Sequence, residues 1–173
     1  MQLTLLRHAP LPLCHQKRYN GWSDIPIDPN LFDHQKVAHL KKQQFDLIYS
    51  SDLKRCIQTL SLIFEEQEIA TTMALREVKF KEEIEGKSFE EIKKLATFRP
   101  HYLESEILWH HYICEESQEA FHQRLNEFLQ QLPKKKKILI CSHAGAIRAI
   151  MHLLEASTAT NIEYLDSTTI DWK

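Results

Sequence analysis

Three short apolar runs constrain the fold of this chain more than any other feature of its sequence. They are QLTLLR at 2–7, FDLIYS at 45–50 and KILICS at 137–142, and each has the length of a strand. Strands that are apolar throughout are typical of parallel sheets covered by helices on both faces. Further strands are expected over 70–75 and, at an edge, over 162–172. The chain is therefore predicted to be an α/β protein, a three-layer α/β/α sandwich with a mostly parallel central sheet.

Segments with helical periodicity separate these strands. The clearest apolar stripe runs from Leu53 to Phe64 and follows Ser51, which is expected to cap its helix. Ser88 and Glu91 form a capping box that starts a short helix. Other helices are expected over 31–43, 97–113, 117–132 and 144–155, with Pro100 interrupting the second of them. Strands alternating with helices in this way indicate a covered parallel sheet.

Length, charge and cysteine content limit the classes of protein to which the chain can belong. The 173 residues suit a single domain over 1–173, and a formal charge of −2 gives no electrostatic case for nucleic acid or an anionic membrane. No segment approaches the roughly 20 apolar residues of a membrane span, and the N-terminus does not resemble a signal peptide. The cysteines show no paired spacing. We therefore expect a reduced, cytoplasmic protein, and the sequence leaves a homodimer open.

Polar side chains follow the ends of three predicted strands. Arg7 and His8 close the first strand, Arg55 lies in the first turn of the helix after the second, and His143 follows the fourth. Taken alone, Arg55 would be a solvated helix residue, and His143 would be a core histidine as often as a functional one. Ligands of parallel sheets bind beyond the carboxyl ends of the strands, however, so these side chains should share one pocket. Two arginines, two histidines and two helix starts suit a phosphate ester.

A phosphate site with a nucleophile also needs a proton donor for the leaving oxygen. Glu77 follows the apolar stretch that ends at Leu75, so the end of the third strand positions it for this role. Periodicity does not single it out, because it lies in a charged stretch. A metal site at His110-His111 is set aside, since adjacent residues of a helix point about 100° apart.

Five motifs occur in a fixed order along the chain. They are LLRHAP at 5–10, RYNGWSDIPI at 18–27, IYSSDLKRCIQTL at 48–60, LREVKF at 75–80 with EG at 85–86, and LICSHAGAIRAI at 139–150. In this order and spacing they resemble the histidine phosphatase superfamily, which has the phosphoglycerate mutase-like fold. One motif alone would be weak evidence, whereas five together make the resemblance specific.

The resemblance implies a role for each polar group. His8 would be the nucleophile that becomes phosphohistidine, and Glu77 would protonate the leaving group and then deprotonate the attacking water. Arg7, Arg55 and His143 would hold the phosphoryl oxygens. The substrate-binding residues would be Asn20, Gly21, Ala144 and Arg148. The resemblance implies no metal and no cofactor, and the expected partner is a small-molecule phosphate ester.

Three residues beside the two histidines depart from the family pattern. Ala9 and Ala144 stand where glycines are usual, and Pro10 removes a backbone donor. These changes bear on the shape of the pocket, and they keep open a degenerate, non-catalytic module that only binds phosphate. The charged groups remain in place, which favours an enzyme.

Within the family, the sequence favours a phosphatase over a mutase-like phosphotransferase. The ~65 residues between Glu77 and His143 leave little room for the segments that guard a mutase phosphoenzyme from water. The loop at 18–27 and the compact length look most like the α-ribazole phosphatase branch, which would act on α-ribazole 5′-phosphate in cobalamin biosynthesis. A general small-molecule phosphomonoesterase is the alternative function that ranks next.

Overall fold

A five-stranded sheet forms the centre of the protein in this computed structural model, which describes residues 1–156 and 161–172. Its strands are β1 (Gln2–Arg7), β2 (Leu47–Ser51), β3 (Ile69–Thr72), β4 (Lys137–Ser142) and β5 (Ser167–Asp171), in the order β3-β2-β4-β1-β5. All neighbours are parallel except β5, which pairs antiparallel with β1 at one edge. Because β4 lies between β1 and β2, the carboxyl ends of these three strands meet.

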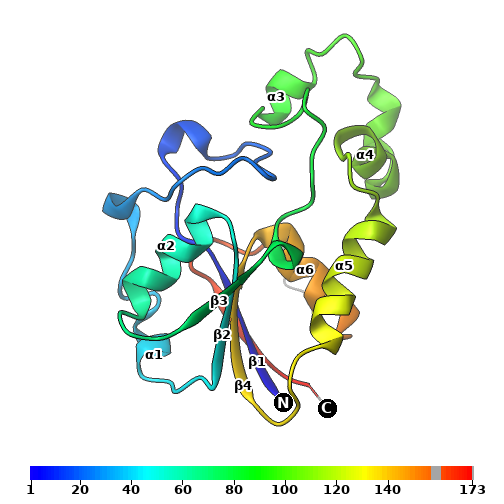
Figure 1. Ribbon diagram of the computed structural model, residues 1–173. Helices are drawn as coiled ribbons and strands as arrows, with labels where there is room; N and C mark the ends of the chain where they lie inside the picture. The colour runs from blue at the N-terminus through cyan, green and yellow to red at the C-terminus, as the bar shows by residue number, and fades with distance from the viewer. Residues whose placement is uncertain (157–160, 173) are drawn as a thin grey trace.

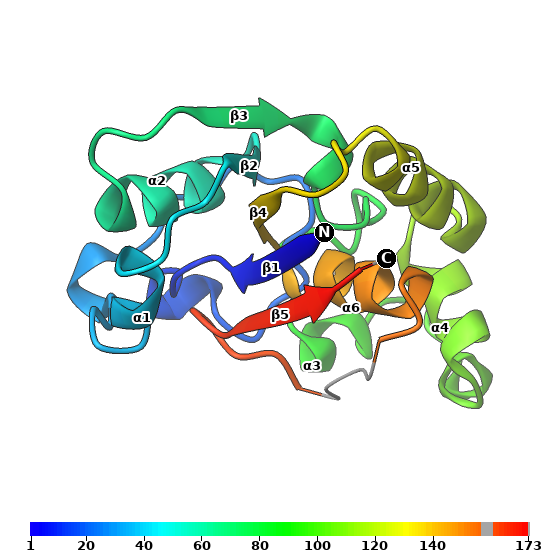
Figure 2. The same cartoon turned by 90° about the horizontal axis from the view of Figure 1, so that it is seen from below.

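Helices cover both faces of this sheet (Figures 1 and 2). On one side lie α1 (Ala38–Lys41) and α2 (Lys54–Ile63), and on the other lie α5 (Gln118–Gln130) and α6 (Ala144–Leu153). The residues of β4 alternate between two apolar clusters: Ile138 and Ile140 face α5 and α6, whereas Leu139 and Cys141 face α1 and α2. This alternation explains why the strands carry apolar side chains on both faces.

Two further helices, α3 (Phe89–Ile92) and α4 (Glu106–Ile113), lie beyond the carboxyl ends of the strands (Figure 1). They belong to the long connection between β3 and β4, which also includes α5. Within the described part of the chain, no helix combines the length and the apolarity that crossing a membrane requires. The connection therefore covers the end of the sheet at which ligands of parallel α/β proteins bind.

The predicted fold class is confirmed. The three apolar runs form β1, β2 and β4, and the capping box at Ser88 opens α3 as expected. The third strand is shorter than predicted, because the Thr72 hydroxyl accepts a hydrogen bond from the amide of Ala74 and a 3₁₀ turn follows. The edge strand occupies Ser167–Asp171 rather than 162–172. The single domain expected over 1–173 extends over residues outside the described ranges and stays a prediction.

Two helix predictions are wrong in their extent. The helix expected over 31–43 is reduced to α1, because the Asp33 carboxylate accepts hydrogen bonds from the amides of Gln35 and Lys36 and holds that segment in a turn. The helix expected over 97–113 is divided into a 3₁₀ turn at Pro100–Leu103 and α4, which begins where the Ser105 hydroxyl accepts from the amide of Leu108.

Candidate active site

The ends of β1 and β4 bring two predicted histidines together. Arg7, the last residue of β1, lies opposite Ser142, the last residue of β4. His8 and His143 follow directly, and their rings lie 5.3 Å apart between centroids in an edge-to-face arrangement. Both side chains are buried, at 5% and 2% exposure. We call this the strand-end pocket, formed by Arg7, His8, Arg55 and His143.

His8 is held in the tautomer that a nucleophile needs. Its Nδ1 lies 2.8 Å from the carbonyl oxygen of Ala9, so Nδ1–H donates and the lone pair is on Nε2. Burial, followed by the positive charges of Arg55 and Arg7, lowers the pKa of His8 well below its ordinary value. His8 is therefore neutral near pH 7, with Nε2 free to attack a phosphorus atom.

Ala9 and Pro10 fit the backbone beside His8. Ala9 is fully buried, its amide donates to the Thr59 hydroxyl at 2.8 Å, and its φ lies outside the left-handed region that would favour glycine. Pro10 needs no amide proton here, and its carbonyl oxygen accepts from the amide of Asp28 at 2.9 Å. These two departures from the family pattern therefore leave His8 well supported.

His143 is neutral as well, and the protein bonds both of its ring nitrogens. Nδ1 accepts from Nε of Arg55 at 3.1 Å, and Nε2 lies 2.9 Å from the Ser51 hydroxyl. Because arginine only donates, Nε2 carries the proton. Burial and the charge of Arg55 lower the pKa of His143. Ser51 therefore contacts His143 instead of capping α2, whose N-cap residue is Leu53, and the predicted capping role is wrong.

Arg55 connects the strand-end pocket to the loop at 18–27. It lies in the first turn of α2, as the sequence predicted, and is 1% exposed. Besides His143, its guanidinium donates to the carbonyl oxygens of Gly21 and Ser23, both at 2.7 Å. A guanidinium carries more N–H groups than these three partners use, so Arg55 can also donate to phosphoryl oxygens.

Arg7 supplies a second cation beside His8. Its Nη1 donates to the carbonyl oxygen of Ile162 at 2.5 Å, and its guanidinium carbon lies 4.0 Å from the centre of the Tyr164 ring. Its Nε is buried and has no hydrogen-bond partner among the described residues. A buried guanidinium N–H in this state is a group that an oxyanion would satisfy.

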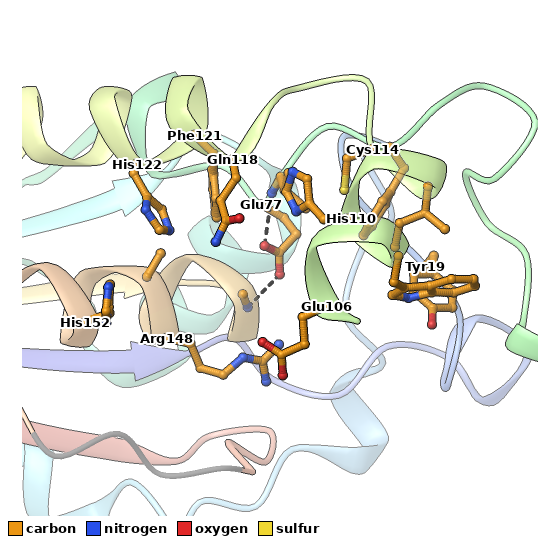
Figure 3. Close-up of a pocket in the computed structure, with 16 residues that line it drawn as sticks. Tyr19, Glu77, Glu106, His110, Cys114, Gln118, Phe121, His122, Arg148 and His152 are labelled. Carbon is orange, nitrogen blue, oxygen red and sulfur yellow. Dashed lines mark hydrogen bonds between the residues drawn. The ribbon is translucent and has the colours of Figure 1, made fainter. Parts of the chain in front are cut away.

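Glu77 reaches the same end of the sheet from the loop after β3. Its carboxylate accepts from the amides of Val78 at 3.0 Å and Gly145 at 2.9 Å (Figure 3). A Cβ at position 145 would collide with this carboxylate, so glycine there allows Glu77 to keep this position. The resemblance drew attention to Ala144, but the glycine that admits the acid is Gly145. Gly145 was not among the residues predicted for the site.

Arg124 and Glu116 hold the loop that carries Glu77. The Arg124 guanidinium makes two bonds of 2.8–2.9 Å to the Glu116 carboxylate. It also donates to the carbonyl oxygens of Ala74 at 2.8 Å and Arg76 at 3.1 Å. Neither residue was predicted, because a charged residue in α5 or just before it gives no sequence signal that distinguishes it from a solvated surface. The pair positions Glu77 without touching its carboxylate.

A cavity of about 810 Å³ lies beside Glu77 (Figure 3). Glu77 and Gly145 line it, and α4, α5 and α6 each contribute one face. Arg7, His8, Arg55 and His143 are not among its lining residues. Glu77 lines this cavity, and its charge also acts on Arg7 and Arg55, which suits a phosphoryl group held by the strand-end residues and a leaving group in the cavity.

The four predicted substrate-binding residues fall in different places. Arg148 lines the cavity, whereas Asn20, Gly21 and Ala144 do not. The amide of Gly21 donates to the carboxylate of Glu85 at 2.9 Å and its carbonyl accepts from Arg55, so Gly21 shapes the loop. Asn20 donates to the carbonyl oxygen of His15 at 2.6 Å, and its buried Oδ1 has no partner among the described residues. Ala144 is the first residue of α6.

Gly145→Ala is expected to displace Glu77 from its position. The added Cβ overlaps the carboxylate, which must rotate away and lose the hydrogen bond from the residue 145 amide. Hydrolysis of alkyl phosphates should fall by about 10²-fold, the scale of one lost general acid. Steady-state kinetics check this, with Gly86→Ala as the control that adds the same methyl group where a Cβ would contact no described atom. Parent activity in Gly145→Ala would contradict the placement of Glu77.

Acidification is expected to destabilise the fold through His8 and His143. Their pKa values in the folded protein lie below the ordinary 6.5 of the unfolded chain, so the unfolded chain binds more protons as the pH falls. The free energy of unfolding is therefore full above about pH 6.5 and declines below it, at up to about 1.4 kcal/mol per pH unit for each histidine. Urea unfolding across this range measures the decline. His8→Asn should make it shallower, and an unchanged slope would contradict the account.

Comparison with known proteins places these observations in a family. Residues 3–171 match the histidine phosphatase superfamily (branch 1). The 2,3-bisphosphoglycerate-dependent phosphoglycerate mutases of Cytophaga hutchinsonii and Nautilia profundicola are each 26% identical to the chain. These matches cover 96% and 93% of this chain and 83% and 87% of the two mutases.

Solved structures show the same likeness. A phosphoserine phosphatase from Entamoeba histolytica, in complex with 3-phosphoglyceric acid, is 26% identical and has a TM-score of 0.75, covering 97% of this chain and 89% of that chain. A phosphoglycerate mutase from Thermus thermophilus is 24% identical and has a TM-score of 0.72, covering 99% of this chain and 94% of that chain. At that identity the second likeness is one of fold.

Proposed function

Because the chain belongs to the histidine phosphatase superfamily, we propose that it is a metal-independent phosphomonoesterase that works through a phosphohistidine at His8. One observation carries this proposal. His8 is neutral because burial and the charges of Arg55 and Arg7 lower its pKa, and its Nε2 has no hydrogen-bond partner among the described residues. The negative charge of Glu77 acts to raise the pKa values of Arg7 and Arg55. The proposed acid and the two arginines that would hold the phosphoryl group therefore belong to one site.

The proposed reaction has two displacements at phosphorus. First, Nε2 of His8 attacks, the N–P bond forms, the bond from phosphorus to the ester oxygen breaks, and Glu77 gives its proton to that oxygen. Then water attacks, Glu77 takes the proton back from the water, and the N–P bond breaks to release inorganic phosphate and neutral His8. Arg7 and Arg55 stabilise the charge on the equatorial oxygens in both steps.

A phosphotransferase is the second candidate. The relatives from Cytophaga hutchinsonii and Nautilia profundicola are named phosphoglycerate mutases, which favours it. A mutase must keep water from its phosphoenzyme, yet exposed side chains line the cavity beside Glu77, among them Glu106, Gln118 and Arg148. This openness supports hydrolysis over transfer.

A panel of phosphate esters tests the proposal. We propose a small-molecule substrate met in the cytoplasm, with α-ribazole 5′-phosphate as one candidate beside 3-phosphoglycerate and p-nitrophenyl phosphate. A phosphatase releases inorganic phosphate with measurable kcat/KM in EDTA. A mutase isomerises phosphoglycerate without that release, and a module that only binds phosphate does neither. Either of the last two results would contradict the proposed function.

Glu77→Gln is expected to separate substrates by their leaving groups. Glutamine keeps an acceptor for the amide of Gly145 but has no proton to give. Alkyl phosphates, whose alkoxides leave poorly, should slow by about 10²–10³-fold, and p-nitrophenyl phosphate by less than about tenfold. The kcat of each ester, measured in parallel, checks this. Equal losses on both would mean that another group is the acid.

A further inference from the structure

Two histidines line the cavity away from the strand-end pocket. His122 in α5 and His152 in α6 face each other with 6.0 Å between their ring centroids (Figure 3). His110 in α4 lines the cavity as well, and its Nε2 donates to the carbonyl oxygen of Glu116 at 3.0 Å. In the described part of the chain, no three His, Cys, Asp or Glu side chains are arranged to hold a metal ion. The described residues around His122 and His152 therefore do not form a metal site.

The spacing of residues along α6 sets the distance between Glu77 and the pair His122–His152. Gly145, Arg148 and His152 follow one another at spacings of three and four residues, so they lie on one side of the helix. The Glu77 carboxylate lies at the first of these positions, where it accepts a hydrogen bond from the amide of Gly145. With a rise of about 1.5 Å per residue, His152 lies about 10 Å farther along, with Arg148 about midway.

The charges around the pair favour an anion between the two rings. Burial, followed by the positive charges of His152 and His110, lowers the pKa of His122, and Glu119 acts in the opposite direction. The other charged groups that line the cavity are Arg148 from α6, Glu106 from α4 and Glu77 from its loop. Two imidazolium rings this close repel each other, and an anion bound between them would remove that repulsion.

We propose that the cavity takes a leaving group with a second anionic group, bound between His122 and His152 about 10 Å from the scissile oxygen, with Arg148 beside the intervening chain. This inference rests on the proposed phosphomonoesterase function and names its substrate class. The carboxylate of a three-carbon phospho-acid is too close to its phosphate to span that distance. A longer phosphomonoester with a phosphate, carboxylate or sulfonate at its far end fits.

Two matched esters test this inference on the intact protein. The phosphate monoester of hydroxyhexanesulfonate carries a sulfonate that stays charged at every pH used, and hexyl phosphate is its counterpart without the distal charge. Near pH 6 the sulfonate ester should have a kcat/KM about tenfold higher, the scale of one hydrogen bond to a charged group. The ratio should fall as the pH rises and the imidazoles lose their protons. Both esters react at His8 and Glu77, so the pH dependence that these two groups give to kcat/KM is the same for both esters. It therefore cancels when the two kcat/KM values are divided.

Substitutions of His122 and His152 test whether these residues cause the preference for the sulfonate ester. His122→Asn and His152→Asn should bring the ratio close to one. His152→Lys should keep the preference and make it less dependent on pH, because lysine stays charged. His111→Asn is the matched control, since His111 is exposed on α4 and does not line the cavity. A ratio that His122→Asn and His152→Asn leave unchanged would overturn the inference, as would equal kcat/KM for the two esters in the parent protein.

A second measurement separates this inference from the proposed function. If neither hexyl phosphate nor p-nitrophenyl phosphate is hydrolysed, the proposed function fails. NMR titration of the imidazole Hε1 protons of His122 and His152 then decides the inference, with the sulfonate ester as the added probe. Their pKa values should rise when the probe binds, because an anion stabilises the charged rings. If the sulfonate ester leaves the titrations of both histidines unchanged, the inference is overturned.

Discussion

His8→Asn is expected to lower kcat for every phosphomonoester by about 10⁴-fold or more, the scale on which nucleophile substitutions act. Asparagine can keep the donor that Nδ1 presents to the carbonyl oxygen of Ala9, so the backbone of the pocket is preserved. It has no nitrogen lone pair at the position of Nε2, so no phosphoenzyme can form. Steady-state kinetics with p-nitrophenyl phosphate measure the loss.

The folded state of this variant needs its own control. Urea unfolding near pH 7 should show a small change in stability, because asparagine fits the space of a neutral imidazole that packs against His143 and Tyr164. His111→Asn, at an exposed position, should keep the parent kcat. If His8→Asn turned over substrate at the parent rate, His8 would not be the nucleophile.

Arg55→Lys is expected to damage both phosphate binding and stability. One ammonium cannot serve His143 Nδ1 and the carbonyl oxygens of Gly21 and Ser23, which the guanidinium bonds together. Each buried acceptor left without a donor costs about 1–3 kcal/mol, so the free energy of unfolding should fall by about 2–4 kcal/mol. Affinity for inorganic phosphate should fall by about 10²-fold.

The two effects of Arg55→Lys are measured separately. Urea unfolding reports the stability, and calorimetric titration with inorganic phosphate, under conditions in which the variant is folded, reports the affinity. Arg99→Lys serves as the control, because Arg99 is exposed and its partners among the described residues are only the carbonyl oxygens of Ala96 and Phe98. Parent affinity for phosphate in Arg55→Lys would show that this arginine orders the loop without binding the anion.

The sheet could be predicted from the sequence because burial on both faces leaves a direct pattern. β1, β2 and β4 carry apolar side chains on both faces, and the rule for parallel sheets then placed His8 and His143 at one end. The segment at 31–43 was harder, because local hydrogen bonds from Asp33 compete with the helix and no periodicity reveals them. Ser51 illustrates the same difficulty, since its hydroxyl contacts a histidine from a distant strand.

The cavity could not be predicted, because it depends on how three helices face one another. A helix was predicted over 144–155, but its exposed polar face, formed by Arg148 and His152, was not. The spacing of Gly145, Arg148 and His152 would have been a usable signal for that face. The collision that any Cβ at position 145 would make with Glu77 is a contact between distant segments, and sequence periodicity carries no trace of it.

Trapping the phosphoenzyme tests the central claim most directly. Protein mixed with a phosphomonoester for milliseconds and quenched in alkali, which preserves phosphohistidine, can be digested and analysed by mass spectrometry. We predict a phosphoryl group on the peptide that contains His8, formed at least as fast as the steady-state turnover and absent from His8→Asn. Turnover without any phosphorylated peptide, or a phosphoryl group on His143 instead, would contradict the account.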